Sequence, residues 1–400
     1  MEPQAAVTVR PNRTVGTARK LGVVSVLFSL LAACGGASDE SPTPSDAVPT
    51  AQSPQPGMVA TSRLERPRAA HRATRLANGL VLITGGFTEA GGAGFDAARR
   101  AELYDVSTGS RDGPRMSTGR AGGTATLLED GRVLLTGGYP GEGRPPLATA
   151  EVFEPAGSRF VGTDDMGTAR ADHTATLMPD GRVLLAGGFD KSGTPLATTE
   201  FYDPGSGAFT EGPSLGSPRA SHLATRVGET VVLVGGTEDG SALASTEVLR
   251  GADWRPGPLL GTPRVKHGVV ALDDRRVLVA GGATGTDSNE RLASTEVLDL
   301  EAGSARPGPR LSLGEYKLDG ALAVLDDGRV VLPSGPGLAV FDQDSGRLVA
   351  LPVASYDTRS FRTLTSVGNN QVLVAGGYDD GIIPTDQAIL VTVPDCAPGT

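Results

Sequence analysis

The sequence predicts an all-β fold, and three observations support this prediction. The nine residues at 130–138 read DGRVLLTGG, and near copies of this pattern return along the rest of the chain. The copies are about 50 residues apart, a period that is too long for helical solenoids and suits a unit of four strands. The composition agrees, because 56 Gly and 29 Pro in 400 residues are typical of short strands joined by many turns.

Each part of the repeated pattern predicts a local structure. Asp-Gly or Asn-Gly predicts a tight hairpin turn, because these residues tolerate positive φ, and Val-Leu-Leu predicts a short apolar strand. The closing Gly-Gly permits an unusual backbone conformation or the close approach of a neighbouring segment. These structural glycines are Gly85, Gly86, Gly137, Gly138, Gly187, Gly188, Gly235, Gly236, Gly281, Gly282, Gly376 and Gly377. A degraded copy, Ser334-Gly335, lies between the last two pairs, so the sequence predicts seven units.

The third unit shows the four strands expected in each repeat. They cover 170–177, 182–188, 199–204 and 208–215, and each is short enough for β-structure. One such sheet leaves both of its faces exposed, whereas seven sheets packed radially bury one another. The seventh unit lacks a fourth strand, and residues 58–64 precede the first unit without a partner. We therefore predict that this N-terminal strand closes the ring and removes its open edge.

The units resemble Kelch repeats, which build β-propellers. The resemblance rests on the recurrent Gly-Gly, on RADHTATL at 170–177 and on TEFYDP at 199–204. It implies a seven-bladed Kelch-type β-propeller over residues 58–393, followed by a short tail at 394–400. The sixth unit departs from the pattern, because Tyr316-Lys317-Leu318-Asp319 stands where Arg-x-x-His is expected.

The N-terminal segment has the features of a targeting sequence. Residues 1–33 begin with basic residues, continue with an apolar run and end in Leu-Ala-Ala before Cys34. This ending resembles the lipobox of bacterial lipoproteins, which implies lipidation of Cys34; an ordinary secretory signal with a chance cysteine is the alternative. Residues 34–57 are dense in Ser, Pro, Asp and Thr and predict a disordered tether. We expect a protein anchored in the bacterial cell envelope, in the outer membrane by the identity of Gly35, with a secreted or periplasm-facing protein as alternatives.

Charge and cysteine content restrict the partners. Residues 1–33 hold four of the 36 basic and one of the 46 acidic residues, so the mature chain would carry about −13. Nucleic acid and anionic lipid surfaces are poor partners for such a chain. The two cysteines are Cys34 and Cys396, so a lipidated Cys34 leaves neither a disulfide nor a cysteine-based metal site. We expect a monomer that binds an envelope or extracellular protein or glycan.

The sequence shows no catalytic constellation. The superfamily includes copper radical oxidases that resemble galactose oxidase, which need two tyrosines, two histidines and a cysteine cross-linked to one tyrosine. The four histidines here, His71, His173, His222 and His267, occupy one repeat position and are therefore dispersed around the ring. Nucleophile-elbow and phosphate-loop motifs are absent from the sequence. We expect no catalytic residue, no metal and no cofactor.

Arginine and glutamate also recur with the repeat. The arginines precede the first strands, as Arg68, Arg120, Arg170, Arg219, Arg264 and Arg359, and the glutamates lie in third strands, as Glu102, Glu151, Glu200, Glu247 and Glu296. In one interpretation the two sets form partly buried pairs within or between blades. In the other, the arginines surround the channel mouth and bind an acidic ligand. Both interpretations stay open at this point.

These patterns favour a non-catalytic, envelope-anchored binding scaffold. The loops after each Gly-Gly and the connections into each Arg-x-x-His strand lie on the same face of a four-stranded meander, and they differ most between units. Variable loops on a rigid frame are the usual place for recognition. The alternative is a carbohydrate-active propeller enzyme, an oxidase or isomerase, which would require an acid, a base or a metal cluster.

Overall fold

The computed structural model describes residues 59–89, 95–285, 290–353, 359–379 and 381–395. The predicted signal peptide, Cys34, the predicted tether and Cys396 lie outside these residues. All regular elements of the described residues are strands. We find among them no helix long and apolar enough to cross a bilayer.

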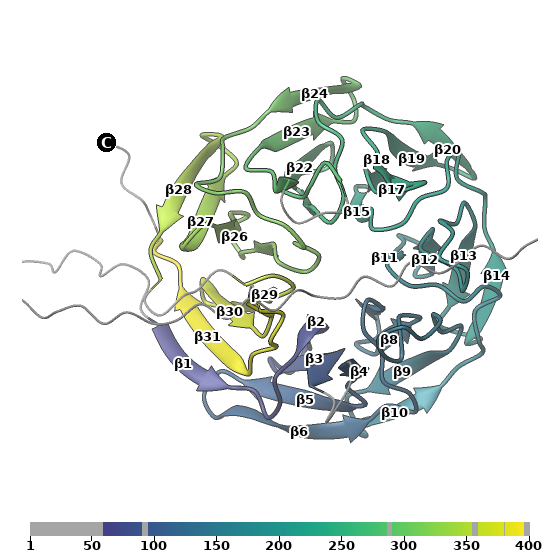
Figure 1. The fold of residues 1–400 in the computed structure, drawn as a ribbon, viewed down its shortest axis with the longest axis vertical. Coiled ribbons are helices and arrows are strands. Elements are labelled where there is room, and N and C mark those ends of the chain that lie inside the picture. The colour runs from purple at the N-terminus through teal and green to yellow at the C-terminus, as the bar shows by residue number, and fades with distance from the viewer. Residues whose placement is uncertain (1–58, 90–94, 286–289, 354–358, 380, 396–400) are drawn as a thin grey trace, which may run out of the picture. The chain divides into compact units, whose positions relative to one another are not determined.

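The strands form seven antiparallel sheets arranged as the blades of a β-propeller (Figure 1). Blade 1 contains β2 (Ala69–Arg75), β3 (Val81–Glu89), β5 (Arg100–Asp105) and β6 (Gly109–Arg115), and β4 (Phe95–Ala97) pairs with β3. Blade 2 contains β7 (Thr124–Leu127), β8 (Val133–Thr136), β9 (Ala150–Glu154) and β10 (Arg159–Gly162). Blade 3 contains β11 (Thr174–Leu177), β12 (Val183–Ala186), β13 (Thr199–Asp203) and β14 (Ala208–Glu211).

The remaining blades follow the same order. Blade 4 contains β15 (Leu223–Val227), β16 (Thr230–Val234), β19 (Thr246–Arg250) and β20 (Asp253–Pro256), with the hairpin of β17 (Thr237–Glu238) and β18 (Ser241–Ala242) in its loop. Blade 5 contains β21 (Gly268–Ala271), β22 (Arg276–Ala280), β23 (Thr295–Asp299) and β24 (Ser304–Pro307). Blade 6 contains β25 (Ala323–Val324), β26 (Val330–Ser334), β27 (Gly337–Asp342) and β28 (Arg347–Leu351). Blade 7 contains β29 (Thr363–Gly368), β30 (Gln371–Ala375), β31 (Gln387–Thr392) and β1 (Val59–Arg63).

The N-terminal strand closes the ring, which confirms the prediction for this segment. β1 pairs antiparallel with β31, from Val59 opposite Val391 to Arg63 opposite Gln387. In Figure 1 the purple β1 lies beside the yellow β31, so the two ends of the propeller meet in one sheet. The edge of β31 is thereby paired instead of exposed.

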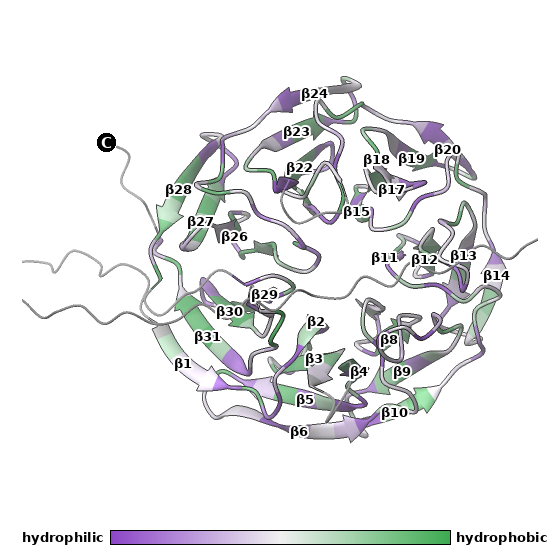
Figure 2. Ribbon diagram, viewed as in Figure 1, coloured by the Kyte–Doolittle hydropathy of each residue, from purple (hydrophilic) through white to green (hydrophobic). Residues whose placement is uncertain are grey.

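The core lies between neighbouring blades. One cluster contains Leu134 and Val152 of blade 2 together with Leu185 and Tyr202 of blade 3. Similar clusters of buried apolar residues join the other blades. Figure 2 shows hydrophobic second and third strands, whereas β20 and β24 at the edge are hydrophilic. Each blade thus depends on its neighbours for the burial of its faces.

The paired glycines lie where two blades meet. A side chain on Gly137 would place its Cβ 2.2 Å from the carbonyl oxygen of Arg170 in the next blade. One on Gly138 would lie 2.7 Å from the backbone nitrogen of Gly123 in its own blade. Both glycines also have positive φ, of 56° and 88°. The recurrent Gly-Gly is therefore required by close backbone contact and by conformation together.

The first strands are shorter than the sequence predicts. β11 begins at Thr174 and not at Arg170, because Asp172 has a φ of 51° and interrupts the ladder. Before this point, Ala171 forms an isolated bridge with Phe189. The same positive φ recurs in the other blades, although β2 of blade 1 runs from Ala69 through Ala70.

Candidate functional site

Five of the six predicted arginines form buried ion pairs with the predicted glutamates. The guanidinium nitrogen lies 2.5 to 3.0 Å from the carboxylate in each pair, and no arginine side chain is more than 3% exposed. The pairs are Arg68–Glu102, Arg120–Glu151, Arg170–Glu200, Arg219–Glu247 and Arg264–Glu296. Each pair lies within one blade.

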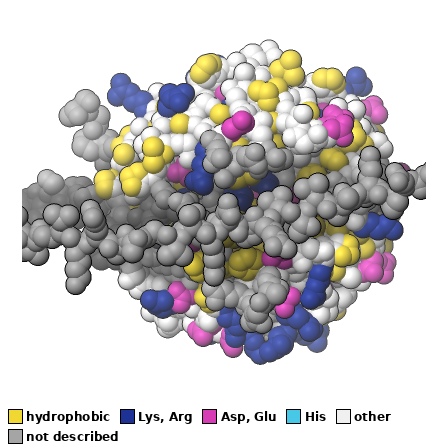
Figure 3. Space-filling model, viewed as in Figure 1, with side chains coloured by type: hydrophobic (Ala, Val, Ile, Leu, Met, Phe, Trp, Pro, Cys, Tyr) yellow, Lys and Arg dark blue, Asp and Glu magenta, His cyan; other side chains and the backbone are white. Residues whose placement is uncertain are grey.

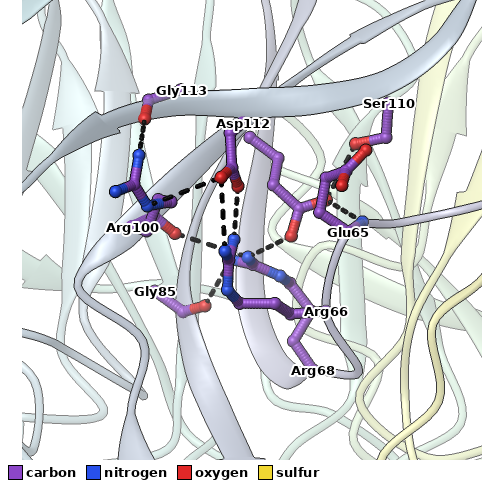
Figure 4. Close-up of polar contacts among 9 residues, drawn as sticks. Glu65, Arg66, Arg68, Gly85, Arg100, Ser110, Asp112 and Gly113 are labelled. Atoms are coloured by element: carbon purple, nitrogen blue, oxygen red, sulfur yellow. Dashed lines mark hydrogen bonds and ion pairs between the residues drawn. The ribbon is translucent and has the colours of Figure 1, made fainter.

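Figure 4 shows how one pair connects three parts of blade 1. Arg68 Nη1 donates to the carbonyl of Gly85 at 2.9 Å, and Nη2 donates to Glu102 Oε1 at 2.5 Å. The other carboxylate oxygen accepts from the backbone N–H of Glu65 and from the Ser110 hydroxyl, both at 2.8 Å. The ion pair therefore fixes the first glycine, the third strand and the incoming connection to one another.

This burial corrects the interpretation that the arginines surround the channel mouth and bind an acidic ligand. Burial lowers the pKa of Arg170, and the contact with Glu200 opposes this shift. Its guanidinium also donates to the carbonyls of Gly187 and Thr198, so protein groups surround it. The alternative interpretation, structural pairing, is the one that the geometry supports for the five arginines. Arg359 in blade 7 differs, because its side chain is half-buried.

The histidines join neighbouring blades. His71, His173 and His222 share hydrogen bonds of 2.9 to 3.1 Å through Nε2 with threonine hydroxyls of the preceding blade, Thr363, Thr136 and Thr174 respectively. Burial, followed by nearby arginines, lowers the pKa of His222 to about 3 and lowers the others well below the usual range. These imidazoles are therefore neutral structural groups.

The junction between blades 6 and 7 uses different residues. Glu315 occupies the arginine position of blade 6. Its backbone carbonyl accepts a hydrogen bond from the N–H of Gly282 at 2.8 Å, and the carbonyl of Arg264 in blade 5 accepts in the same way from the N–H of Gly236. Arg362 occupies the histidine position of blade 7 and lies 3.5 Å from Glu315. The sequence register that placed Tyr316 at the arginine position was therefore wrong by one residue.

One ring of residues was missed by the sequence analysis. In every blade, the second residue after the arginine position has a φ between 50° and 63°. We call these residues the axial ring: Ala70, Gly122, Asp172, Ser221, Lys266, Lys317 and Phe361. At several junctions the backbone N–H of one ring residue donates to the carbonyl of the previous one, as from Asp172 to Gly122 at 2.9 Å. A left-handed conformation costs a residue with a side chain about 1–2 kcal/mol, and glycine avoids this cost.

Aromatic side chains surround one lysine of the axial ring. Lys317 Nζ lies 5.3 Å from the centroid of Tyr316, 4.7 Å from that of Phe361 and 4.9 Å from that of Tyr378. Its ammonium also donates to the Tyr378 hydroxyl. Burial, followed by repulsion from Lys266, lowers the pKa of Lys317 to about 8. Lys317 is therefore a confined cation with a lowered pKa.

A cavity of about 220 Å³ lies next to the axial ring. Its walls include Arg72, Thr124, Thr174, Leu223, Asp319 and Thr363, and each of these lies two residues after the ring residue of its blade. Arg72 Nη2 lies 2.5 Å from Asp319 Oδ2, although blade 7 separates their two blades in the ring. The axial ring therefore borders the end of this cavity that faces the post-glycine loops.

The predicted recognition loops lie on one face of the propeller. Phe189 follows the Gly-Gly of blade 3, and its backbone exchanges hydrogen bonds of 2.8 and 3.1 Å with Ala171, which follows Arg170. Figure 3 shows basic, acidic and hydrophobic side chains interspersed around the periphery of the face in view. We call the post-glycine loops and the connections into the first strands the rim.

Exposed apolar side chains gather on the rim. Four large hydrophobic side chains of the described residues are more than half exposed, namely Leu259 (69%), Leu313 (55%), Ile382 (55%) and Ile383 (53%). The first two lie in connections to first strands, and the isoleucines lie in the post-glycine loop of blade 7. Ile382 also has a φ of 61°, an outlier for a β-branched residue.

The described residues contain no group of three or more His, Cys, Asp or Glu side chains that could hold a metal ion. Neither the family models nor the curated proteins compared with this chain give a match. Among solved structures, the chain is similar to a fungal alcohol oxidase of the AA5 family in complex with copper. The two are 15% identical with a TM-score of 0.66, and the likeness covers 85% of this chain and 77% of the oxidase. At this identity the likeness shows the fold alone, and the chain is a seven-bladed β-propeller with the fold of that oxidase.

Proposed function

We propose that this chain is an envelope-anchored lipoprotein whose Kelch-type propeller is a non-catalytic scaffold for a protein or a glycan. The distribution of exposed apolar side chains carries the proposal, because all four that are more than half exposed lie on the rim. The strained backbone of Ile382 supports it, since residues in costly conformations cluster at functional sites. The repeat arginines, glutamates and histidines hold the frame together and leave recognition to the rim loops.

The copper chemistry of the oxidase does not fit the described residues. Nε2 of His71, His173 and His222 already bonds to a threonine, and each histidine lies at a different blade junction. Their rings also pack against glycines of the preceding blade, so they do not face a common point. We therefore derive no oxidation step for this chain.

The lipid anchor predicts a fractionation result. Cys34 follows an apolar run in a Leu-Ala-Ala-Cys context, and several acyl chains together hold a protein durably on a membrane. The Cys34→Ala variant should therefore move from the membrane fraction to the soluble fraction of lysed cells. Equal membrane retention of the variant and the wild type would refute lipidation at this cysteine.

If the rim binds a partner, substitution of Ile382 should raise stability but, together with substitution of Ile383, should lower binding. Asparagine tolerates positive φ better than isoleucine, so Ile382→Asn should slightly raise the free energy of unfolding. Combined with Ile383→Ser, it should reduce by at least about fivefold the amount of envelope components captured by the purified protein, because apolar contact area is lost. Quantitative mass spectrometry of the captured material measures this effect.

Val106→Ser is the matched control for this prediction. Val106 is 44% exposed and lies in the turn between β5 and β6, on the face opposite the rim. Its replacement should leave capture unchanged. If the Val106 variant loses the captured components while the isoleucine variant keeps them, the binding face lies on the other side.

A further inference from the structure

The axial ring carries side chains that its backbone does not require. All seven positions have positive φ, a conformation that glycine adopts at the lowest cost, yet Gly122 is the one glycine among them. Gly122 leaves space for the Asp172 carboxylate, which would lie 2.8 Å from a Cβ at this position. Charged side chains held in a costly conformation beside a cavity point to a binding role.

Lysine is concentrated in this ring. Lysines make up four of the 36 basic residues, and two of them, Lys266 and Lys317, occupy ring positions in adjacent blades. Both ammonium groups approach Tyr316, at 5.8 and 5.3 Å from its ring centroid. Lys266 is among the groups that lower the pKa of Lys317, so the two positive charges repel each other in a partly buried site. An anion between them removes this repulsion, although the whole chain has a net charge of −10.

Charges of both signs act on Lys317. Lys266 and Arg291 are the cations that act on it, and Asp172 is the anion. The Tyr378 hydroxyl accepts from the Lys317 ammonium, and burial raises the pKa of Tyr378 to about 12, so this phenol stays neutral. A lysine ammonium is a compact point charge and binds a carboxylate at close range.

The cavity sets the size of the ligand. Its volume of about 220 Å³ is below the roughly 300–1,000 Å³ of pockets for drug-sized ligands. Arg72 and Asp319 neutralise each other in its wall, and Lys266 and Lys317 belong to the axial ring that borders it. We propose that the axial ring and this cavity form a binding site for a small organic carboxylate, held between Lys266 and Lys317.

This inference deepens the proposed function, because the axial ring lies on the same face as the rim loops. It rests on the proposed function in this respect alone. Benzoate is a suitable probe, and benzamide is its neutral counterpart of the same shape. Isothermal titration of the purified full chain should show benzoate binding at least about tenfold more tightly than benzamide, or about 1.4 kcal/mol. Lys266→Met and Lys317→Met should each weaken benzoate binding about tenfold.

Two controls separate this result from misfolding. Lys191→Met removes an exposed lysine of another post-glycine loop and should leave benzoate binding unchanged. Asp172→Asn removes the anion beside the lysines and should tighten binding several-fold, a gain that a misfolded protein does not give. The Ile382→Asn, Ile383→Ser variant should keep benzoate binding, so failure of the rim proposal and failure of this one are distinguishable.

The site also predicts a pH dependence. The ammonium form of Lys317 is present below its pKa of about 8 and is lost above it. Benzoate stays ionised throughout this range, so its affinity should fall between pH 7 and pH 9 in the wild type and stay flat in Lys317→Met. Equal affinities for benzoate and benzamide, absence of benzoate binding, or an equal loss in Lys191→Met would overturn the proposal.

Discussion

Deletion of residues 35–66 should lower the free energy of unfolding by roughly 5 kcal/mol or more, a large part of the roughly 5–15 kcal/mol of a typical domain. The deletion removes β1, whose five residues pair with β31 from Val59 to Arg63. Each backbone hydrogen bond contributes about 0.5–1.5 kcal/mol. Burial of Leu64, which is 4% exposed, contributes about 1.5–3 kcal/mol more. Urea denaturation of the truncated and full-length proteins measures the difference.

Deletion of residues 35–57 is the matched control, because it stops before β1 and retains every paired residue of blade 7. Its free energy of unfolding should equal that of the mature protein within error. Equal stability of the two truncations would contradict the role of β1 in ring closure.

Glu200→Ala should cost about 3–5 kcal/mol of folding free energy, because it leaves the buried guanidinium of Arg170 without its counter-ion. The same substitution removes the acceptor for the backbone N–H groups of Gly167 and Thr168, at 2.7 and 3.1 Å. The connection into blade 3 therefore loses its attachment as well. Urea denaturation again provides the measurement.

Glu154→Ala provides the comparison for this pair. Glu154 lies 2.8 Å from Arg159, but the arginine side chain is 67% exposed and that of Glu154 is 31% exposed. Exposed pairs contribute about 1 kcal/mol or less, so this substitution should have little effect. Similar losses in the two variants would show that burial of the repeat pair adds nothing to its strength.

The ring architecture could be predicted from the sequence because its determinants are local and repeated. Asp-Gly turns such as Asp130-Gly131 form as expected, with a φ of 83° at the glycine. The missing fourth strand of the seventh unit also identified residues 58–64 as the closing segment, and the pairing of β1 with β31 confirms it. Repetition allowed one well-formed unit to define the strands of the weaker ones.

The axial ring could not be predicted from the sequence, because its positions carry no shared residue type. Asp172, Ser221, Lys266 and Phe361 look unrelated until the backbone shows that all have positive φ. Lys317 and Tyr378 are 61 residues apart and meet only when blades 6 and 7 pack around the axis. The choice between paired and ligand-binding arginines also required the structure, because it depends on burial.

The most direct test of the binding face is site-specific photo-cross-linking in intact cells. A benzophenone amino acid replaces Ile382 on the rim in one variant and Val106 on the opposite face in another. If the rim carries recognition, the probe at position 382 should give discrete cross-linked species on a denaturing gel, and the probe at position 106 should give none. Cross-links at position 106 without any at position 382 would contradict the account.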